Sequence, residues 1–105
     1  MEQTPIYKVV ISERARQMLS EHMRFLAQTS PISARNVKNA LIAAIRSLNQ
    51  FPERFPFISA DFIPPNKYHK MLAEKRYLIL YQIKDQTVYV DLVVDCRQDY
   101  SWLLW

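Results

Sequence analysis

A group of polar and reactive side chains follows directly on the most hydrophobic run of the chain. Residues 87–95 form that run, and the sequence continues with Cys96, Arg97, Gln98, Asp99 and Tyr100 before an apolar ending at residues 101–105 that includes Trp102 and Trp105. Arg97 and Asp99 are spaced to pair with each other or with acids of the run, and partly buried charges usually are paired. The stretch therefore predicts either a structurally fixed tail or a surface that binds a polar partner.

A metal site has little support in the sequence. His22 and His69 are isolated, Cys96 is the single cysteine, and no ligand spacing is present. We therefore expect neither a metal nor another cofactor, and we interpret His22 as a packed histidine on the apolar side of a helix. Cys96 and His69 could form a nucleophile–base pair on adjacent strands, but a buried structural thiol is the favoured interpretation.

The segment from residue 67 to residue 76 is a second candidate for chemistry. It contains a cluster of cations with an interleaved aromatic and one acid: Lys67, Tyr68, His69, Lys70, Glu74, Lys75 and Arg76. Such a set can grip a phosphate backbone and stack on a base. The same composition is typical of a solvated edge strand, where lysines discourage aggregation. The sequence alone favours neither interpretation.

Composition narrows the classes of protein that need to be considered. The 105 residues contain 14 Lys and Arg against 10 Asp and Glu, and half are hydrophobic, so we expect one compact domain over residues 1–105. There is no glycine, which excludes the Walker loop and the Rossmann glycine turn. Neither a secretion signal nor an 18-residue apolar run is present, so we expect a cytoplasmic protein that does not contact the membrane.

The elements that must position these side chains can be outlined from periodicity. Residues 6–11 predict a buried strand, Ser12 is suited to cap a helix that ends near Thr29, and Pro31 breaks that helix before Ser33 caps a second one. The two helices should form an antiparallel hairpin. The predicted apolar stripe of the first helix is Ala15, Met18, Leu19, His22, Phe25 and Leu26, and that of the second is Ala34, Val37, Leu41, Ala44, Ile45 and Leu48.

Three further strands are expected after a proline-rich crossing loop at residues 51–66. They cover residues 67–72, 77–83 and 87–95, with a polar turn at residues 84–86. The predicted fold is α+β in the order β-α-α-β-β-β, with the helical hairpin on a mostly antiparallel sheet. Simple alternation in the last strand places Val88, Val90, Leu92 and Val94 on one face and Tyr89, Asp91, Val93 and Asp95 on the other.

This layout resembles the RelE/ParE superfamily of toxins from type II toxin–antitoxin systems. The phrases that carry the resemblance are "YKVVISERARQML", "IRSLNQFPERFP" and "YLILYQIKDQTVYVDLVVDCRQD", in that order along nearly the whole chain. The resemblance implies a growth-inhibiting toxin of the plasmid-stabilisation kind, neutralised by a cognate antitoxin. RelE-like members are ribosome-dependent mRNA endonucleases, whereas ParE-like members poison DNA gyrase.

The residues present favour the ParE-like branch. The Tyr-Lys-x-Lys strand of the nucleases is matched only by Tyr68, His69 and Met71, and Leu78 stands where an arginine is usual. In-line attack by a ribose hydroxyl needs a base and cations, which Met71 and Leu78 do not supply. "CRQDYSWLL" resembles a ParE-type ending, with Cys96 where histidine is common. The resemblance thus assigns target binding to Arg97, Gln98, Asp99, Tyr100, Trp102 and Trp105.

Two alternatives stay open. The first is an mRNA nuclease with a rearranged set, comprising Tyr68, His69 as general base, Lys70, Arg76, Arg97 and Tyr100. The second is a non-toxic homologue that only binds an antitoxin and takes part in autoregulation. In every case we expect DNA to be contacted only indirectly, through the antitoxin.

The helical hairpin and the sheet edge together are the predicted antitoxin-binding surface. Between residues 12 and 50 the acids are only Glu13 and Glu21, so a disordered acidic segment of an antitoxin could fold onto the excess of cations. The predicted antitoxin-binding residues are Arg14, Arg16, Arg24, Arg35, Lys38 and Arg46.

Overall fold

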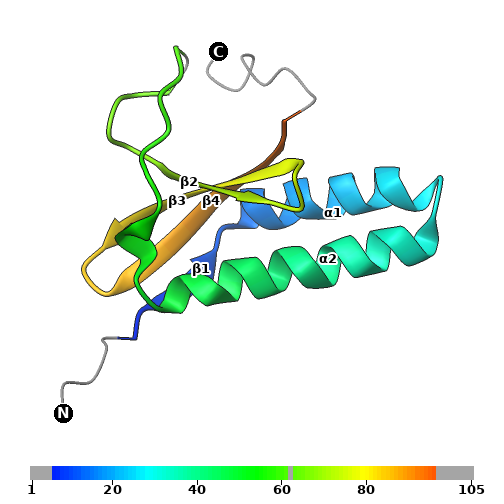
Figure 1. Cartoon of the computed structure of the whole chain (residues 1–105), viewed down its shortest axis with the longest axis horizontal. Coiled ribbons are helices and arrows are strands. Elements are labelled where there is room, and N and C mark those ends of the chain that lie inside the picture. Colours follow the sequence, from blue (N-terminus) through cyan, green and yellow to red (C-terminus); the bar gives the residue numbers. More distant parts are fainter. Residues whose placement is uncertain (1–5, 62, 97–105) are drawn as a thin grey trace.

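The predicted order of elements is confirmed by a computed structural model, which describes residues 6–61 and 63–96 (Figure 1). The elements are β1 (Lys8–Ile11), α1 (Glu13–Ala27), α2 (Pro31–Arg46), the 3₁₀ helices η1 (Ser47–Asn49) and η2 (Pro52–Arg54), β2 (His69–Ala73), β3 (Tyr77–Lys84) and β4 (Thr87–Asp95). The fold is α+β, as expected. No helix within the described ranges is long and apolar enough to cross a membrane.

The four strands form one mixed sheet in the order β1-β4-β3-β2. β2 pairs with β3 and β3 with β4 in antiparallel fashion, whereas β1 runs parallel to β4. A parallel pair needs a long crossover connection, and here the crossover contains the helical hairpin. β1 therefore joins the sheet that the three later strands were expected to form.

The helix starts follow from serine caps. The Ser12 hydroxyl accepts a hydrogen bond from the Ala15 amide at 3.0 Å and caps α1 as predicted. The prediction that Ser33 caps the second helix is wrong, because Ser30 is the cap and Pro31 occupies the first turn. Proline is favoured there, since its fixed φ suits the helix and its missing N–H would have no helical partner.

The main core lies between the hairpin and one face of the sheet. Leu19 of α1 and Leu41 and Ile45 of α2 pack with Ile79 and Tyr81 of β3.

The prediction that Phe25 belongs to the buried stripe of the first helix is wrong, because 59% of this residue is exposed. The end of the hairpin extends past the sheet (Figure 1), so no strand lies beneath that turn of α1.

A β-bulge interrupts the alternation in β4. Tyr81 pairs with Val90 and Leu80 with Leu92, which leaves Asp91 as the extra residue. The predicted two-face assignment is therefore wrong beyond Asp91: Val93 joins Val88 and Val90 in the core under the helices. Leu92 and Val94 instead join a second apolar cluster with Ile63 and Leu80 on the other face.

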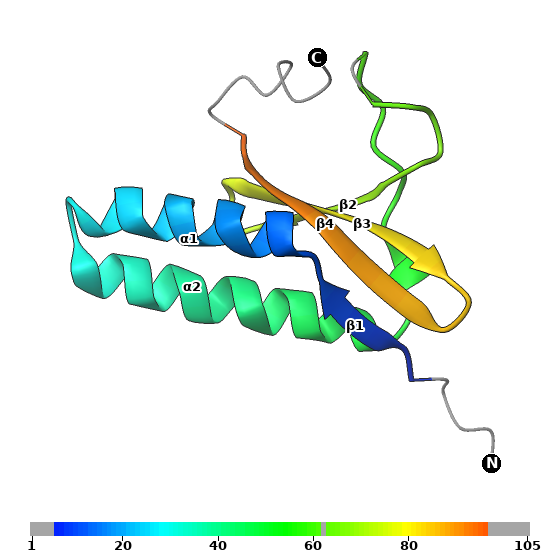
Figure 2. The ribbon, with the colours of Figure 1, turned by 180° about the vertical axis from the view of Figure 1, so that it is seen from behind.

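β3 pairs with β4 along its whole length, but on the opposite edge the short β1 reaches only as far as Val90, and α1 takes over that edge from there (Figure 2). The Ser12 hydroxyl donates to the Asp91 carbonyl at 3.2 Å, and His22 Nε2 donates to the Val93 carbonyl at 2.8 Å. These bonds satisfy carbonyls that would otherwise be buried without a partner. The interpretation of His22 as a packed histidine is confirmed, since only 9% of it is exposed.

Candidate functional site

His69 is held as a structural residue. Its ring lies between Phe57 (4.2 Å between centroids) and Tyr81 (5.2 Å), and both rings are stacked on it. Nδ1 donates to the Phe55 carbonyl at 2.7 Å, which requires the proton to sit on that nitrogen. The histidine therefore anchors the crossing loop to β2.

Tyr68 and Lys70 point away from His69. Successive residues of a strand alternate between faces, and His69 stacks on core residue Tyr81, whereas Tyr68 packs with the second apolar cluster. Burial raises the pKa of the Tyr68 hydroxyl above its usual value, and the charge of Asp91 together with a hydrogen bond to its carboxylate raises it further. Because the raised pKa favours the protonated form, the Tyr68 hydroxyl is poorly suited to act as a general base.

Arg76 forms an ion pair with Asp95 at the end of the sheet. Its Nε and Nη2 donate to one carboxylate oxygen of Asp95 at 2.9 and 2.7 Å, and the two side chains are only 19% and 2% exposed. The Cys96 amide donates to the Arg76 carbonyl at 2.8 Å. The β2–β3 turn is thus tied to the point where β4 ends.

The alternative nuclease set is not assembled among its described members. His69 lies on the helix side of the sheet, Tyr68 and Lys70 belong to the other side, and Arg76 is bound to Asp95. Its remaining members, and the whole predicted target-binding set, lie outside the described residues: Arg97, Gln98, Asp99, Tyr100, Trp102 and Trp105.

Cys96 differs from its prediction in two ways. It is exposed rather than buried. The pair with His69 is also wrong, because β3 lies between β2 and the end of β4. Partial desolvation and then the charge of Asp95 raise the pKa of the Cys96 thiol, so it favours the protonated form over the nucleophilic thiolate.

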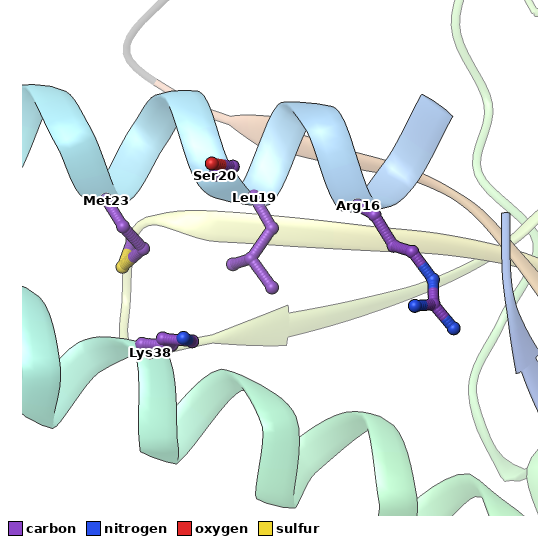
Figure 3. A pocket seen from close by; sticks show the side chains of 5 residues that line it. All are labelled: Arg16, Leu19, Ser20, Met23 and Lys38. Atoms are coloured by element: carbon purple, nitrogen blue, oxygen red, sulfur yellow. The ribbon is translucent and has the colours of Figure 1, made fainter. Parts of the chain in front are cut away.

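The predicted antitoxin-binding cations do not form one cluster. Arg16 and Lys38 line a groove of about 230 Å³ between α1 and α2, together with Leu19, Ser20 and Met23 (Figure 3). Arg14 instead acts electrostatically on Tyr68, at the other side of α1. Arg24, Arg35 and Arg46 are exposed on the helices, and within the described ranges the one salt bridge is that of Arg76 with Asp95.

Several backbone positions that favour glycine carry other residues. φ is positive at Phe51, Asn66, Glu74, Lys75 and Asp85. Arg54 stabilises the first of these, since its guanidinium donates to the carbonyls of Gln50 and Phe51 and, at 3.2 Å, to the Ser47 hydroxyl. The Phe51 residue itself is 57% exposed. These positions were not predicted from the sequence, because glycine, the residue that most often marks them, is absent.

Within the described ranges, no three or more His, Cys, Asp or Glu side chains lie close enough together to hold a metal ion.

Comparison with known proteins identifies the family. No curated protein sequence matches the chain. A solved structure titled "Chromosomal ParDE TA system from P. aeruginosa" has a similar fold, with a TM-score of 0.71 at 10% identity over 88% of this chain and 98% of that one. The profile described as "ParE toxin of type II toxin-antitoxin system, parDE" matches residues 9–100. The resemblance read from the sequence is thereby confirmed, and the chain belongs to the ParE toxin family of type II toxin–antitoxin systems.

Proposed function

We propose that this toxin inhibits growth by poisoning DNA gyrase and that it performs no chemistry of its own. The observation that carries the proposal is the dispersal of the nuclease set. Cleavage of RNA requires a base and charge-stabilising cations to reach the same phosphate. His69 faces the core and Arg76 neutralises Asp95, so neither is available for that task. Membership of the ParE family supports the same conclusion.

The target-binding surface is assigned to the segment that follows β4. Arg97, Gln98, Asp99, Tyr100, Trp102 and Trp105 are its proposed contact residues. The Arg76–Asp95 ion pair and the Cys96 amide hydrogen bond fix the point from which this segment continues. A fixed origin reduces the conformational freedom that binding must remove, which favours affinity.

The antitoxin is assigned to the groove between α1 and α2. Leu19 and Met23 give it an apolar lining, and Arg16 and Lys38 add two cations (Figure 3). An amphipathic helix with acidic residues beside its apolar face would complement both features. Antitoxin binding in this groove would neutralise the toxin, as expected of a toxin–antitoxin system.

Two assays with purified toxin test the target. With gyrase, we expect loss of supercoiling activity and accumulation of cleaved DNA. In a ribosome-based translation system, we expect intact mRNA. Cleaved mRNA together with unaffected gyrase would overturn the proposal in favour of the nuclease. Unimpaired growth on induction, with both assays negative, would instead identify a non-toxic homologue.

Charge reversal tests the antitoxin groove. The double variant Arg16→Glu/Lys38→Glu should weaken binding of the antitoxin encoded beside the toxin gene by at least ten-fold, since a rim charge pair contributes on the order of 1 kcal/mol and reversal adds repulsion. Lys67→Glu/Lys84→Glu, which reverses the same number of charges away from the groove, is the control and should bind as the wild type does. Equal loss in the control and in the groove variant would show that the effect is one of net charge and that the groove is wrongly assigned.

A further inference from the structure

Within the part of the chain that the structure describes, no element covers one half of the sheet on the face that turns away from the helices. Alternation in β1, β3 and β4 places Tyr7, Val9, Tyr81, Ile83 and Val88 in or against the core, so the residues between them point to the opposite face. Register then aligns them in two rows across the strands. We call this surface the open sheet face; it comprises Lys8, Val10, Gln82, Lys84, Thr87 and Tyr89. Tyr68 of the second apolar cluster borders it, through hydrogen bonds to Asp91 and Gln82.

The crossing loop covers only the other half of this face. Ile58, Ala60 and Ile63 of the loop pack against the second apolar cluster around Leu80 and Leu92. Neither α1 nor α2 replaces the loop over the open half, because their buried side chains pack on the core face. Tyr89 is consequently 38% exposed at the centre of a sheet.

Positive charge surrounds the open sheet face. Lys8 and Lys84 are exposed on the strands either side of β4, both opposite Thr87. Lys67 lies with Nζ 5.4 Å from the centroid of the Tyr68 ring. None of these three lysines forms a salt bridge with a described residue.

Asp91, the acidic residue on this face, already accepts hydrogen bonds from neighbouring side chains. Asp91 accepts a hydrogen bond from Gln82 Nε2 at 2.7 Å, and Tyr68 binds the same carboxylate. Arg14 adds a cation next to Tyr68. Lys8, Lys67, Lys84 and Arg14 outnumber Asp91 and the turn residue Asp85, so the net charge around the face is positive, which favours an anionic partner.

The position of Tyr89 indicates what kind of anion fits. Its ring lies in one row with Val10 and Gln82, and the row beside it carries the two lysines. Lys8 and Lys84 are two strand spacings apart, about 10 Å. A base stacked on an exposed ring with flanking phosphates near cations is the usual way in which a sheet binds an unpaired strand. A duplex offers no base faces to such a ring.

We propose that the open sheet face binds single-stranded DNA, with Tyr89 stacking on a base and Lys8 and Lys84 neutralising phosphates. The choice of DNA over RNA rests on the proposed gyrase target, an enzyme that opens DNA. This differs from the expectation that DNA is contacted only through the antitoxin. The face would place the toxin directly on the DNA that its target handles.

The test measures fluorescence anisotropy of a labelled 12-nucleotide oligo-dT titrated with the whole chain, and it contains no gyrase. Its failure therefore leaves the proposed function intact. Tyr89→Ala should weaken binding about ten-fold, since stacking contributes roughly 1–3 kcal/mol per base, and Tyr89→Phe should retain the affinity. Lys8→Gln/Lys84→Gln should lower the slope of log K against log salt by about 0.7 for each lysine.

The matched control is Arg24→Gln/Arg35→Gln, which removes the same charge from the helical hairpin. It should bind within two-fold of the wild type, and melting curves must show that every variant is folded. If the control loses as much affinity as the lysine pair, or Tyr89→Ala binds as the wild type does, the open sheet face is not a DNA site. Tighter binding of oligo-U or of heparin than of oligo-dT would overturn the assignment to DNA.

Discussion

The ion pair between Arg76 and Asp95 should contribute strongly to stability. It is the one salt bridge within the described ranges, it lies where β4 ends, and both guanidinium contacts reach the same carboxylate oxygen at 2.7 and 2.9 Å. We expect Arg76→Ala to destabilise the fold severely. Truncation removes both of the guanidinium hydrogen bonds that Arg76 donates to Asp95, which is 1% exposed.

The magnitude follows from burial and distance. At 2.7 Å the attraction is about 6 kcal/mol for an effective dielectric constant of 20, and desolvation of the two groups offsets part of it. Removing one partner of a buried pair typically costs about 3–5 kcal/mol. That is a large fraction of the roughly 5–15 kcal/mol that separates folded from unfolded states. The melting temperature should fall by at least about 12 °C.

A double-mutant cycle provides the assay. The free energy of unfolding is measured in urea for Arg76→Ala, Asp95→Asn and the double variant, with exposed Arg35→Ala as a control that should change it by less than about 0.5 kcal/mol. Asp95→Asn should cost less than Arg76→Ala, because Arg76 is 19% exposed and can hydrate. Additive effects within about 0.5 kcal/mol, or a loss below about 1 kcal/mol for Arg76→Ala, would refute this account of the pair.

Three further predictions concern a turn, a phenol and the chain end. Lys75 has φ 59°, so Lys75→Gly should stabilise the fold by about 1 kcal/mol in urea unfolding, while the control Lys70→Gly within β2 should destabilise it by a similar amount. Burial raises the pKa of Tyr81 to about 12, so the folded state keeps its proton where the unfolded state loses it, and stability should fall as pH rises from about 10 to 12. The loss approaches about 2–3 kcal/mol and should be absent in Tyr81→Phe, measured by unfolding at each pH. Deleting residues 101–105 should abolish growth inhibition while antitoxin pull-down persists; a truncated chain that folds and still inhibits growth would remove the target-binding role from this segment.

Periodicity predicted the elements because helices and strands are encoded locally. Each expected helix and strand has a counterpart, and the last strand has the predicted bounds of residues 87–95. The bulge at Asp91 was not predictable from alternation, since Val90, Asp91 and Leu92 read as an ordinary strand. Its consequence is large, because every later side chain of β4 changes face.

The site was predicted less well because its residues are distant in sequence. Alternation alone separates Tyr68 from His69, but only the structure shows which face the helices cover and that Phe57 closes over His69. Lys8 and Tyr89 were not grouped by the sequence analysis. They share the open sheet face only because β1, near the start of the chain, pairs in parallel with β4, near its end.

The layered fold has a consequence for how neutralisation can work. The groove lined by Arg16 and Lys38 lies between the helices, whereas Lys84 and Tyr89 lie on the sheet face that turns away from them. A ligand in the groove and a ligand on the open sheet face are therefore separated by the core, and neither needs to displace the other. Under the proposed assignments, an antitoxin segment in the groove would leave the open sheet face accessible, so we propose that neutralisation acts through the proposed target-binding segment after β4. The Arg76–Asp95 pair is well placed for such coupling, because it joins the β2–β3 turn to the residue that precedes this segment.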